Sequence, residues 1–219
     1  LVVTDPRTGK SEEITARIAV LAVGHSARDT FSMLMEQGVP MHAKAFATGV
    51  RIEHPQSMVN LSQYGKESVE GLGAAAYKLT ANLPSGRGVY TFCMCPGGYV
   101  VNASSEEGRI AVNGMSYHAR DGKNANSAVV VTVDPVDFGS DSPLAGMEFQ
   151  RRLEEAAFKA GRGKIPVQLY EDFCKNQPSA GPGAVTPMIK GAYAWSTVRS
   201  IFPEEIGDAL EMGIREFDK

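Results

Sequence analysis

Six consecutive apolar residues, Ile18 to Val23, are followed at once by Gly24, His25 and Ser26. An unbroken apolar run of this length predicts a strand buried on both faces of a sheet. Apolar side chains then recur at helical spacing over residues 27–37, with Ser26 as the predicted N-cap. A glycine and free helix N–H groups at such a strand–turn–helix junction suit a bound phosphate, although ordinary turns of α/β folds have the same pattern.

The residues before this run predict a β-hairpin. Residues 1–4 and 11–19 are β-prone and flank a segment dense in turn formers. The chain opens inside an apolar run at Leu1 rather than at a methionine, so we expect a piece of a longer protein. No Gly-x-Gly-x-x-Gly follows any predicted strand, so the usual dinucleotide fingerprint is missing.

The middle of the chain is rich in predicted strands. Residues 45–53 alternate, with Phe46 and Val50 on one face and Gly49, Arg51 and Glu53 on the other. Further β-prone runs cover residues 77–83, 89–95, 99–103, 109–113 and 128–133, and the third and fourth of them predict a second hairpin.

After residue 143 the apolar period becomes helical. We expect helices over residues 149–161 and from Pro203 to 217, with a loop rich in glycine and proline over 176–187. The predicted fold class is therefore α+β, with a mixed or antiparallel, β-rich domain and flanking helices.

Composition excludes several functional classes. The net charge of -3 is spread along the chain without clusters of Lys and Arg, so we expect neither nucleic acid nor a membrane surface as a partner. No apolar stretch is long enough to cross a bilayer, and the start has no signal-peptide pattern. Three cysteines in 219 residues argue against a secreted disulfide framework, so we expect a cytoplasmic protein.

The segment from Cys93 to Gly98 contains the first group of reactive side chains. Cys93 and Cys95, two apart on a strand, are predicted to point to one face as a redox pair, as half of a metal site or as small buried side chains. Because zinc needs about four ligands and Cys174 is remote, we expect no metal. A disulfide in regular strand geometry would be strained. Pro96, Gly97 and Gly98 predict exposed backbone on which a flat ring packs.

Two further segments concentrate polar groups. Residues 113–127 predict a loop of amide, hydroxyl, imidazole and guanidinium groups, which either orients a polar ligand or is simply solvated. Arg51 and Glu53 either form a surface ion pair or clamp a carboxylate, and His54 is a candidate acid–base group.

Several of these segments together resemble a family of bacterial FAD-dependent dehydrogenases, often described as NAD- or FAD-utilising and mostly uncharacterised. The first matching segment is Val20 to Phe31, and the others follow in the family's order. They are Lys44–Gln56, Tyr90–Val100, Asn113–His118 and Asn124–Ser127, with Phe202–Lys219 similar to a later helix of the family.

The resemblance implies a glutathione-reductase-like flavoprotein in which residues 1–43 are a residual piece of the FAD-binding domain. Residues 44–219 would then be an inserted substrate or cap domain. The implied cofactor is FAD, with NAD(P)H as a second candidate, and the implied partners are the rest of the FAD-binding domain and a small-molecule substrate. The implied cofactor contacts are Gly24, His25, Ser26, Pro96, Gly97, Gly98, Asn113, Gly114, Asn124 and Asn126. The candidate catalytic residues are Arg51, His54, Cys93, Cys95 and Arg120.

On this interpretation the intact enzyme transfers hydride between flavin and an unidentified substrate, and the protein supplies orientation and electrostatics. Two alternatives stay open. One is a non-catalytic ligand-binding or interaction module that uses the polar segments, and the other is a thiol oxidoreductase that works without flavin.

Overall fold

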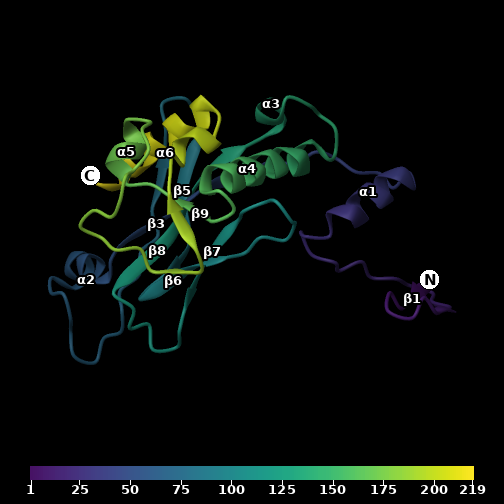
Figure 1. Cartoon of the computed structure of the whole chain (residues 1–219), viewed down its shortest axis with the longest axis horizontal. Helices are drawn as coiled ribbons and strands as arrows, with labels where there is room; N and C mark the ends of the chain where they lie inside the picture. The colour runs from purple at the N-terminus through teal and green to yellow at the C-terminus, as the bar shows by residue number, and fades with distance from the viewer. The chain divides into compact units, whose positions relative to one another are not determined.

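The computed structural model describes residues 1–219, which form two compact units, Leu1–Val39 and Pro40–Lys219 (Figure 1). Helices and mostly antiparallel sheets occur together, so the predicted α+β class is confirmed. The predicted division into residues 1–43 and 44–219 concerns the origin of each part, and it stays a prediction.

The N-terminal unit begins with the predicted hairpin. Strands β1 (Val2–Thr4) and β2 (Ser11–Glu13) pair antiparallel, with Thr4 opposite Ser11. Helix α1 (Arg28–Glu36) follows, as the periodicity predicted. Its N-cap is Ala27 without a side-chain hydrogen bond, so the predicted Ser26 cap is wrong; Ser26 instead offers its backbone carbonyl to the Arg28 N–H, at 2.9 Å.

The predicted buried strand over residues 18–23 is also wrong. These residues form no strand, and Ile18 and Val20 are 84% and 85% exposed. A strand buried on both faces needs hydrogen-bonded neighbours and covering layers. In this structure residues 18–23 pair with no strand. Strand β2 ends at Glu13, before this run, and pairs with β1 alone.

The C-terminal unit is built around a four-stranded antiparallel sheet. Its order is β3 (Phe46–Pro55), β8 (Asn124–Val133), β5 (Gly88–Cys95) and β4 (Thr80–Asn82). The predicted strands are therefore present, with shifted ends. Strand β8 starts at Asn124, which corrects the prediction that residues 113–127 form one loop.

One face of this sheet carries the main hydrophobic core. Val129, Val131 and Val133 alternate toward it and are fully buried. Helices α3 (Pro135–Phe138), α4 (Ala145–Gly161) and α6 (Glu204–Phe217) supply apolar side chains such as Leu210, which is also fully buried. Helices α4 and α6 match the two amphipathic patterns in the sequence, because a buried apolar stripe stabilises such helices more than propensity does.

A second, three-stranded sheet contacts the first. Strands β6 (Gly98–Asn102) and β7 (Val112–Ser116) form the predicted second hairpin, and β10 (Ile189–Lys190) pairs parallel with β6. Both β6 and β7 contact β8. The chain thus places a layer of strands next to the four-stranded sheet, in addition to its layer of helices (Figure 1).

The remaining elements are short. Residues 176–187 form no helix or strand, as predicted. The elements without a sequence prediction are α2 (Gln56–Tyr64), β9 (Ile165–Val167), α5 (Tyr170–Cys174), β11 (Tyr193–Trp195) and the 3-10 helix η1 (Arg199–Ile201). No helix is both long and apolar enough to span a membrane.

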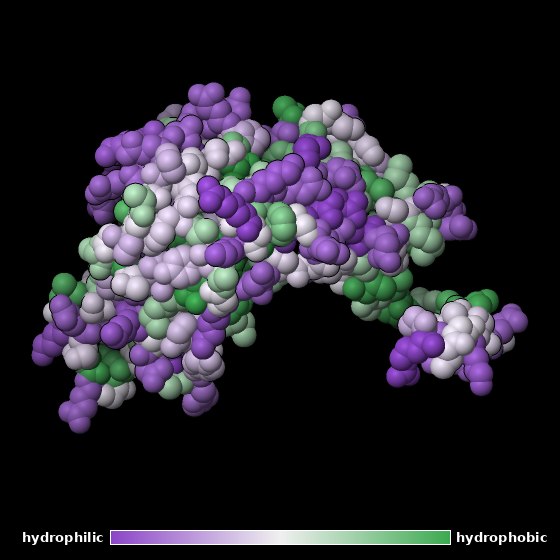
Figure 2. Space-filling model, in the orientation of Figure 1, coloured by the Kyte–Doolittle hydropathy of each residue, from purple (hydrophilic) through white to green (hydrophobic).

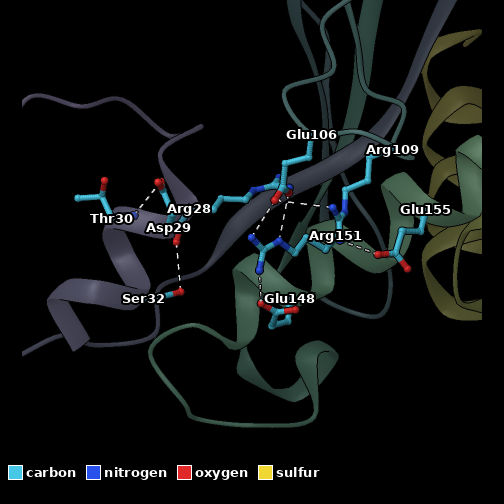
Figure 3. Close-up of polar contacts among 9 residues, drawn as sticks. All are labelled: Arg28, Asp29, Thr30, Ser32, Glu106, Arg109, Glu148, Arg151 and Glu155. Atoms are coloured by element: carbon cyan, nitrogen blue, oxygen red, sulfur yellow. Dashed lines mark hydrogen bonds and ion pairs between the residues drawn. The ribbon is translucent and has the colours of Figure 1, made fainter. Parts of the chain in front are cut away.

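The outer face of α4 carries charged side chains, and the space-filling view is hydrophilic in this area (Figure 2). Arg151 pairs with Glu106 at 2.8 Å and with Glu148 at 2.7 Å, while Arg109 reaches Glu155 at 2.7 Å (Figure 3). These pairs link α4 to the loop between β6 and β7, and partly exposed pairs of this kind contribute little to stability individually.

Candidate functional site

The face of the four-stranded sheet opposite the hydrophobic core carries the candidate site. The alternation of β3 sends Arg51 and Glu53 to this face. Arg51 lies opposite Ala128 in the register, and Asn126 lies between Glu53 and Cys95 on the two neighbouring strands. Side chains that are remote in the sequence are therefore brought together by the strand pairing.

Arg51 is the centre of this group. Its two terminal nitrogens donate to the Cys93 carbonyl, each at 3.2 Å, and to the side-chain oxygens of Asn126 and Asn113. Nη1 also lies 3.9 Å from the Cys95 sulfur. Every acceptor is neutral, and no carboxylate forms an ion pair with this guanidinium. Burial lowers the pKa of Arg51.

Asn126 and Gly114 complete the surroundings of the guanidinium. Asn126 is fully buried, and because its oxygen accepts from Arg51, its amide nitrogen is the atom left without a partner. A Cβ at Gly114 on β7 would clash with both the Arg51 guanidinium and the Asn126 side chain. The second sheet can therefore close over Arg51 only because position 114 has no side chain.

The Cys93–Cys95 segment does not have the regular strand geometry that the sequence predicted. The register of β5 against β8 shifts between Phe92 and Cys95, and Cys93 has a left-handed φ of 46°. Cys93 is exposed and Cys95 is half-buried, and the regular alternation behind the prediction that both point to one face is absent. A bulge of this kind re-aims side chains next to a site and breaks the two-residue alternation.

The Pro96-Gly97-Gly98 turn is buried, which corrects the prediction of exposed backbone. The Gly97 N–H donates to the Gln56 side chain at 2.8 Å, and the Gly97 carbonyl accepts from the Gly122 N–H at 3.1 Å. A Cβ at Gly97, whose φ is 52°, would clash with the Arg120 carbonyl. The turn is therefore pinned between α2 and the loop that follows β7.

Glu53 does not pair with Arg51, so the predicted ion pair is wrong. Its carboxylate accepts from the Met188 N–H at 2.9 Å and from the buried Asn124 side chain at 3.4 Å. Burial raises the pKa of Glu53. Asn124 also donates to the Thr186 carbonyl at 2.9 Å, so it anchors the long loop rather than joining the Arg51 group.

The other candidate catalytic residues lie apart from Arg51. His54 points to the opposite face of the sheet, where its ring is 5.4 Å from that of Tyr77. Burial lowers the pKa of His54 and raises the pKa of Tyr77 to about 12, and the His54 Nε2 has no hydrogen-bond partner. Arg120 has an exposed side chain on the loop between β7 and β8.

Gly24, His25 and Ser26 lie in the N-terminal unit, at the exposed turn before α1. Gly24 has a φ of 76°, which a residue with a side chain rarely adopts. The His25 Nε2 and the Ser26 hydroxyl are 3.4 Å apart. The phosphate-binding role of this turn stays a prediction.

Sequence reasoning missed Gln56, which is buried and bonds the Ala75 carbonyl at 2.9 Å as well as Gly97. Its position directly after a strand carries no motif, so only the fold reveals it. A pocket of about 390 Å³ lies elsewhere, at the start of α6, and its Arg199 is paired with Asp208 and Glu211. No three His, Cys, Asp or Glu side chains are grouped as metal ligands.

Comparison with known proteins gives two findings. Residues 45–219 match the model of a family described as "FAD-dependent protein, C-terminal domain-like". The chain is also 54% identical over 212 residues to an uncharacterised protein of Clostridium beijerinckii (strain ATCC 51743 / NCIMB 8052). That alignment covers 95% of this chain but 40% of the relative, so the chain spans less than half of the relative's length.

Proposed function

The chain belongs to the family described as FAD-dependent protein, C-terminal domain-like, and on this premise we propose that it is the substrate-side part of an FAD-dependent dehydrogenase. The flavin would supply the hydride chemistry, with NAD(P)H as the candidate second cofactor. This chain's residues would bind and orient the reacting groups. The observation that carries the proposal is the half-buried Arg51 guanidinium, which has only neutral hydrogen-bond acceptors.

The donors around Arg51 fit an electron-rich cofactor edge or a substrate carboxylate. A half-buried cation without a carboxylate partner, beside the unpartnered Asn126 amide, is costly unless something negative approaches it. Flavin acquires negative charge when reduced, and a positive charge near its ring tunes that change. Asn113, exposed at the edge of the same group, is the donor and acceptor that a ligand would meet first.

The N-terminal unit supports the same proposal. Its apolar residues 18–23 are exposed although their sequence is that of a buried strand. Exposed apolar runs of this kind mark an interaction surface. We infer that this run pairs with strands of an FAD-binding domain, whose further residues would correspond to the part of the Clostridium beijerinckii relative that this chain does not match.

The test compares flavin binding by two proteins. The complete Clostridium beijerinckii relative and the 219-residue chain would each be purified, scanned for flavin absorbance and titrated with FAD while flavin fluorescence is followed. We expect the relative to carry flavin and to be bleached by NADH or NADPH. We expect the chain alone to bind FAD weakly or not at all, because a dinucleotide site needs both sides of its cleft.

A matched pair of variants in the relative locates the cofactor-facing side. Substitution of the residue aligned with Arg51 by Gln should shift the flavin reduction potential to more negative values, since the anionic reduced form loses a positive neighbour. Substitution of the residue aligned with Arg152, which is exposed on α4 on the other side of the sheet, should leave it unchanged. A relative free of flavin would overturn the proposal and favour the non-catalytic binding module instead.

A further inference from the structure

The bulge in β5 gives Cys93 and Cys95 a geometry that a regular strand would not. The left-handed Cys93 folds the backbone, and the Cys95 thiol turns back to donate to the Cys93 carbonyl at 3.3 Å. Both thiols are free. A disulfide between residues two apart is strained in regular strand geometry, and that geometry is absent here.

Arg51 and Asn126 surround this pair with donors. Arg51 holds the Cys93 carbonyl with both terminal nitrogens and places Nη1 3.9 Å from the Cys95 sulfur. Asn126 is the cross-strand neighbour of Cys95 and has a fully buried, unpartnered amide nitrogen. Its orientation is fixed, because its oxygen accepts from Arg51. A cation and a spare donor therefore lie beside the sulfur of the half-buried cysteine.

We propose that Cys93 and Cys95 form a dithiol–disulfide centre that reduces small disulfides. The exposed Cys93 is the attacking thiol, and the half-buried Cys95 resolves the intermediate. Arg51 is a positioning residue, since it acts through the two cysteines. Phe92, 60% exposed and adjacent to Cys93, offers an apolar contact to the incoming disulfide.

The chemistry balances without a further reactant. The Cys93 thiolate attacks one sulfur of a disulfide RSSR, which forms a mixed disulfide and releases one RS⁻. The Cys95 thiolate then attacks the Cys93 sulfur, which closes the internal disulfide and releases the second RS⁻. Two protein thiols are oxidised, and RSSR is reduced to two RSH after both leaving groups take up the protons. The exchange needs no flavin, so it stands or fails separately from the proposed flavoprotein function.

The test follows the fate of the two sulfurs. All variants carry Cys174→Ser, so that only the pair reacts, and each is treated with the aromatic disulfide DTNB under native conditions. We expect the parent to release two aryl thiolates and to lose two hydrogen atoms by intact-protein mass spectrometry, with no aryl group retained. The C95S variant should release one aryl thiolate and retain one aryl group, bound to Cys93 as a mixed disulfide. C93S should react about tenfold more slowly, because the exposed attacking thiol is gone.

Retention of two aryl groups by the parent would overturn the proposal, as would a C93S variant that reacts at the parent's rate. The parent's mass measurement decides the question even if a serine variant fails to fold. Oxidised glutathione, used in place of DTNB, tests the same reaction with a biological disulfide.

Arg51 is tested through rescue by the conservative variant. R51Q should slow the release about fivefold at neutral pH, whereas R51K, which keeps the positive charge, should restore most of the rate. An R51K variant as slow as R51Q, or an R51Q variant that reacts at the parent's rate, would remove Arg51 from the proposal.

Discussion

The two faces of the four-stranded sheet are buried in different ways. On one face Val129, Val131 and Val133 pack against apolar side chains of the helices. On the other face the same strands present Arg51 and Asn126 to a second sheet. One alternating sequence therefore supplies an apolar core and a polar layer within a few ångströms of each other, because successive side chains of a strand point to opposite faces.

This difference separates residues that hold the fold from residues that hold a site. The apolar face gains free energy from every buried side chain. The polar face contains a guanidinium without a carboxylate, an unpartnered amide and a left-handed cysteine, each of which costs stability. Such features persist where the surrounding structure enforces them, and they gather at functional sites.

The largest effect is expected on the apolar face. Leu210→Ala removes a fully buried side chain of α6 and leaves a cavity against the sheet, so the free energy of unfolding should fall by about 3 kcal/mol. Urea unfolding followed by circular dichroism measures it. Met212→Ala in the same helix is the control, because Met212 is 43% exposed and should change stability by less than about 0.5 kcal/mol. Equal losses in both variants would mean that α6 does not pack as described.

A smaller effect is expected on the polar face. Gly114→Ala places a methyl group where the Arg51 guanidinium and the Asn126 side chain lie, so one of them must move. The free energy of unfolding should therefore fall by about 2 kcal/mol. The control is Gly73→Ala, where no atom lies within 4 Å of the added Cβ. Unfolding experiments compare the two, and the DTNB rate of Cys93 should change in G114A alone. A G114A variant as stable as G73A would show that the second sheet does not press on Arg51.

The apolar face could be predicted from the sequence, and the polar face only in part. Alternation in residues 45–53 assigned Arg51 and Val50 to opposite faces, and the periods of α4 and α6 located their core stripes. Local pattern does not reveal register, however, so the contact between Arg51 and Asn126, 75 positions apart, had no sequence signal. Gly114 likewise looks like any glycine until its neighbours are known.

Residues 18–23 and 93–98 show a second reason why prediction fails. An apolar run is buried only if the chain supplies a partner for its hydrogen bonds, and residues 18–23 have none in this structure. The Cys93 bulge interrupts the strand period at the point where Arg51, from another strand, bonds the Cys93 carbonyl. In both places a long-range contact, present or absent, decides the local conformation.

The smallest expected effects are on the pH dependence of stability, and they come from Glu53 and His54, neighbours on opposite faces of the sheet. The two residues should change stability with pH in opposite directions. Burial raises the pKa of Glu53, so the folded state holds that proton more tightly and wild type should lose stability relative to E53Q as pH rises above the ordinary value of 4.5. Burial lowers the pKa of His54, so the unfolded state holds that proton more tightly. Wild type should therefore lose stability relative to H54F as pH falls below 6.5.

Urea unfolding of the three proteins at several values between about pH 4 and about pH 8 separates the two contributions, because each variant removes one titration only. Gln at position 53 can still accept from the Met188 N–H, and Phe at position 54 keeps the ring contact with Tyr77, so packing changes little. Parallel pH curves for wild type and E53Q would mean that Glu53 is solvated as an ordinary surface carboxylate. Parallel pH curves for wild type and H54F would mean that the His54 imidazole is solvated in the folded state as it is in the unfolded chain.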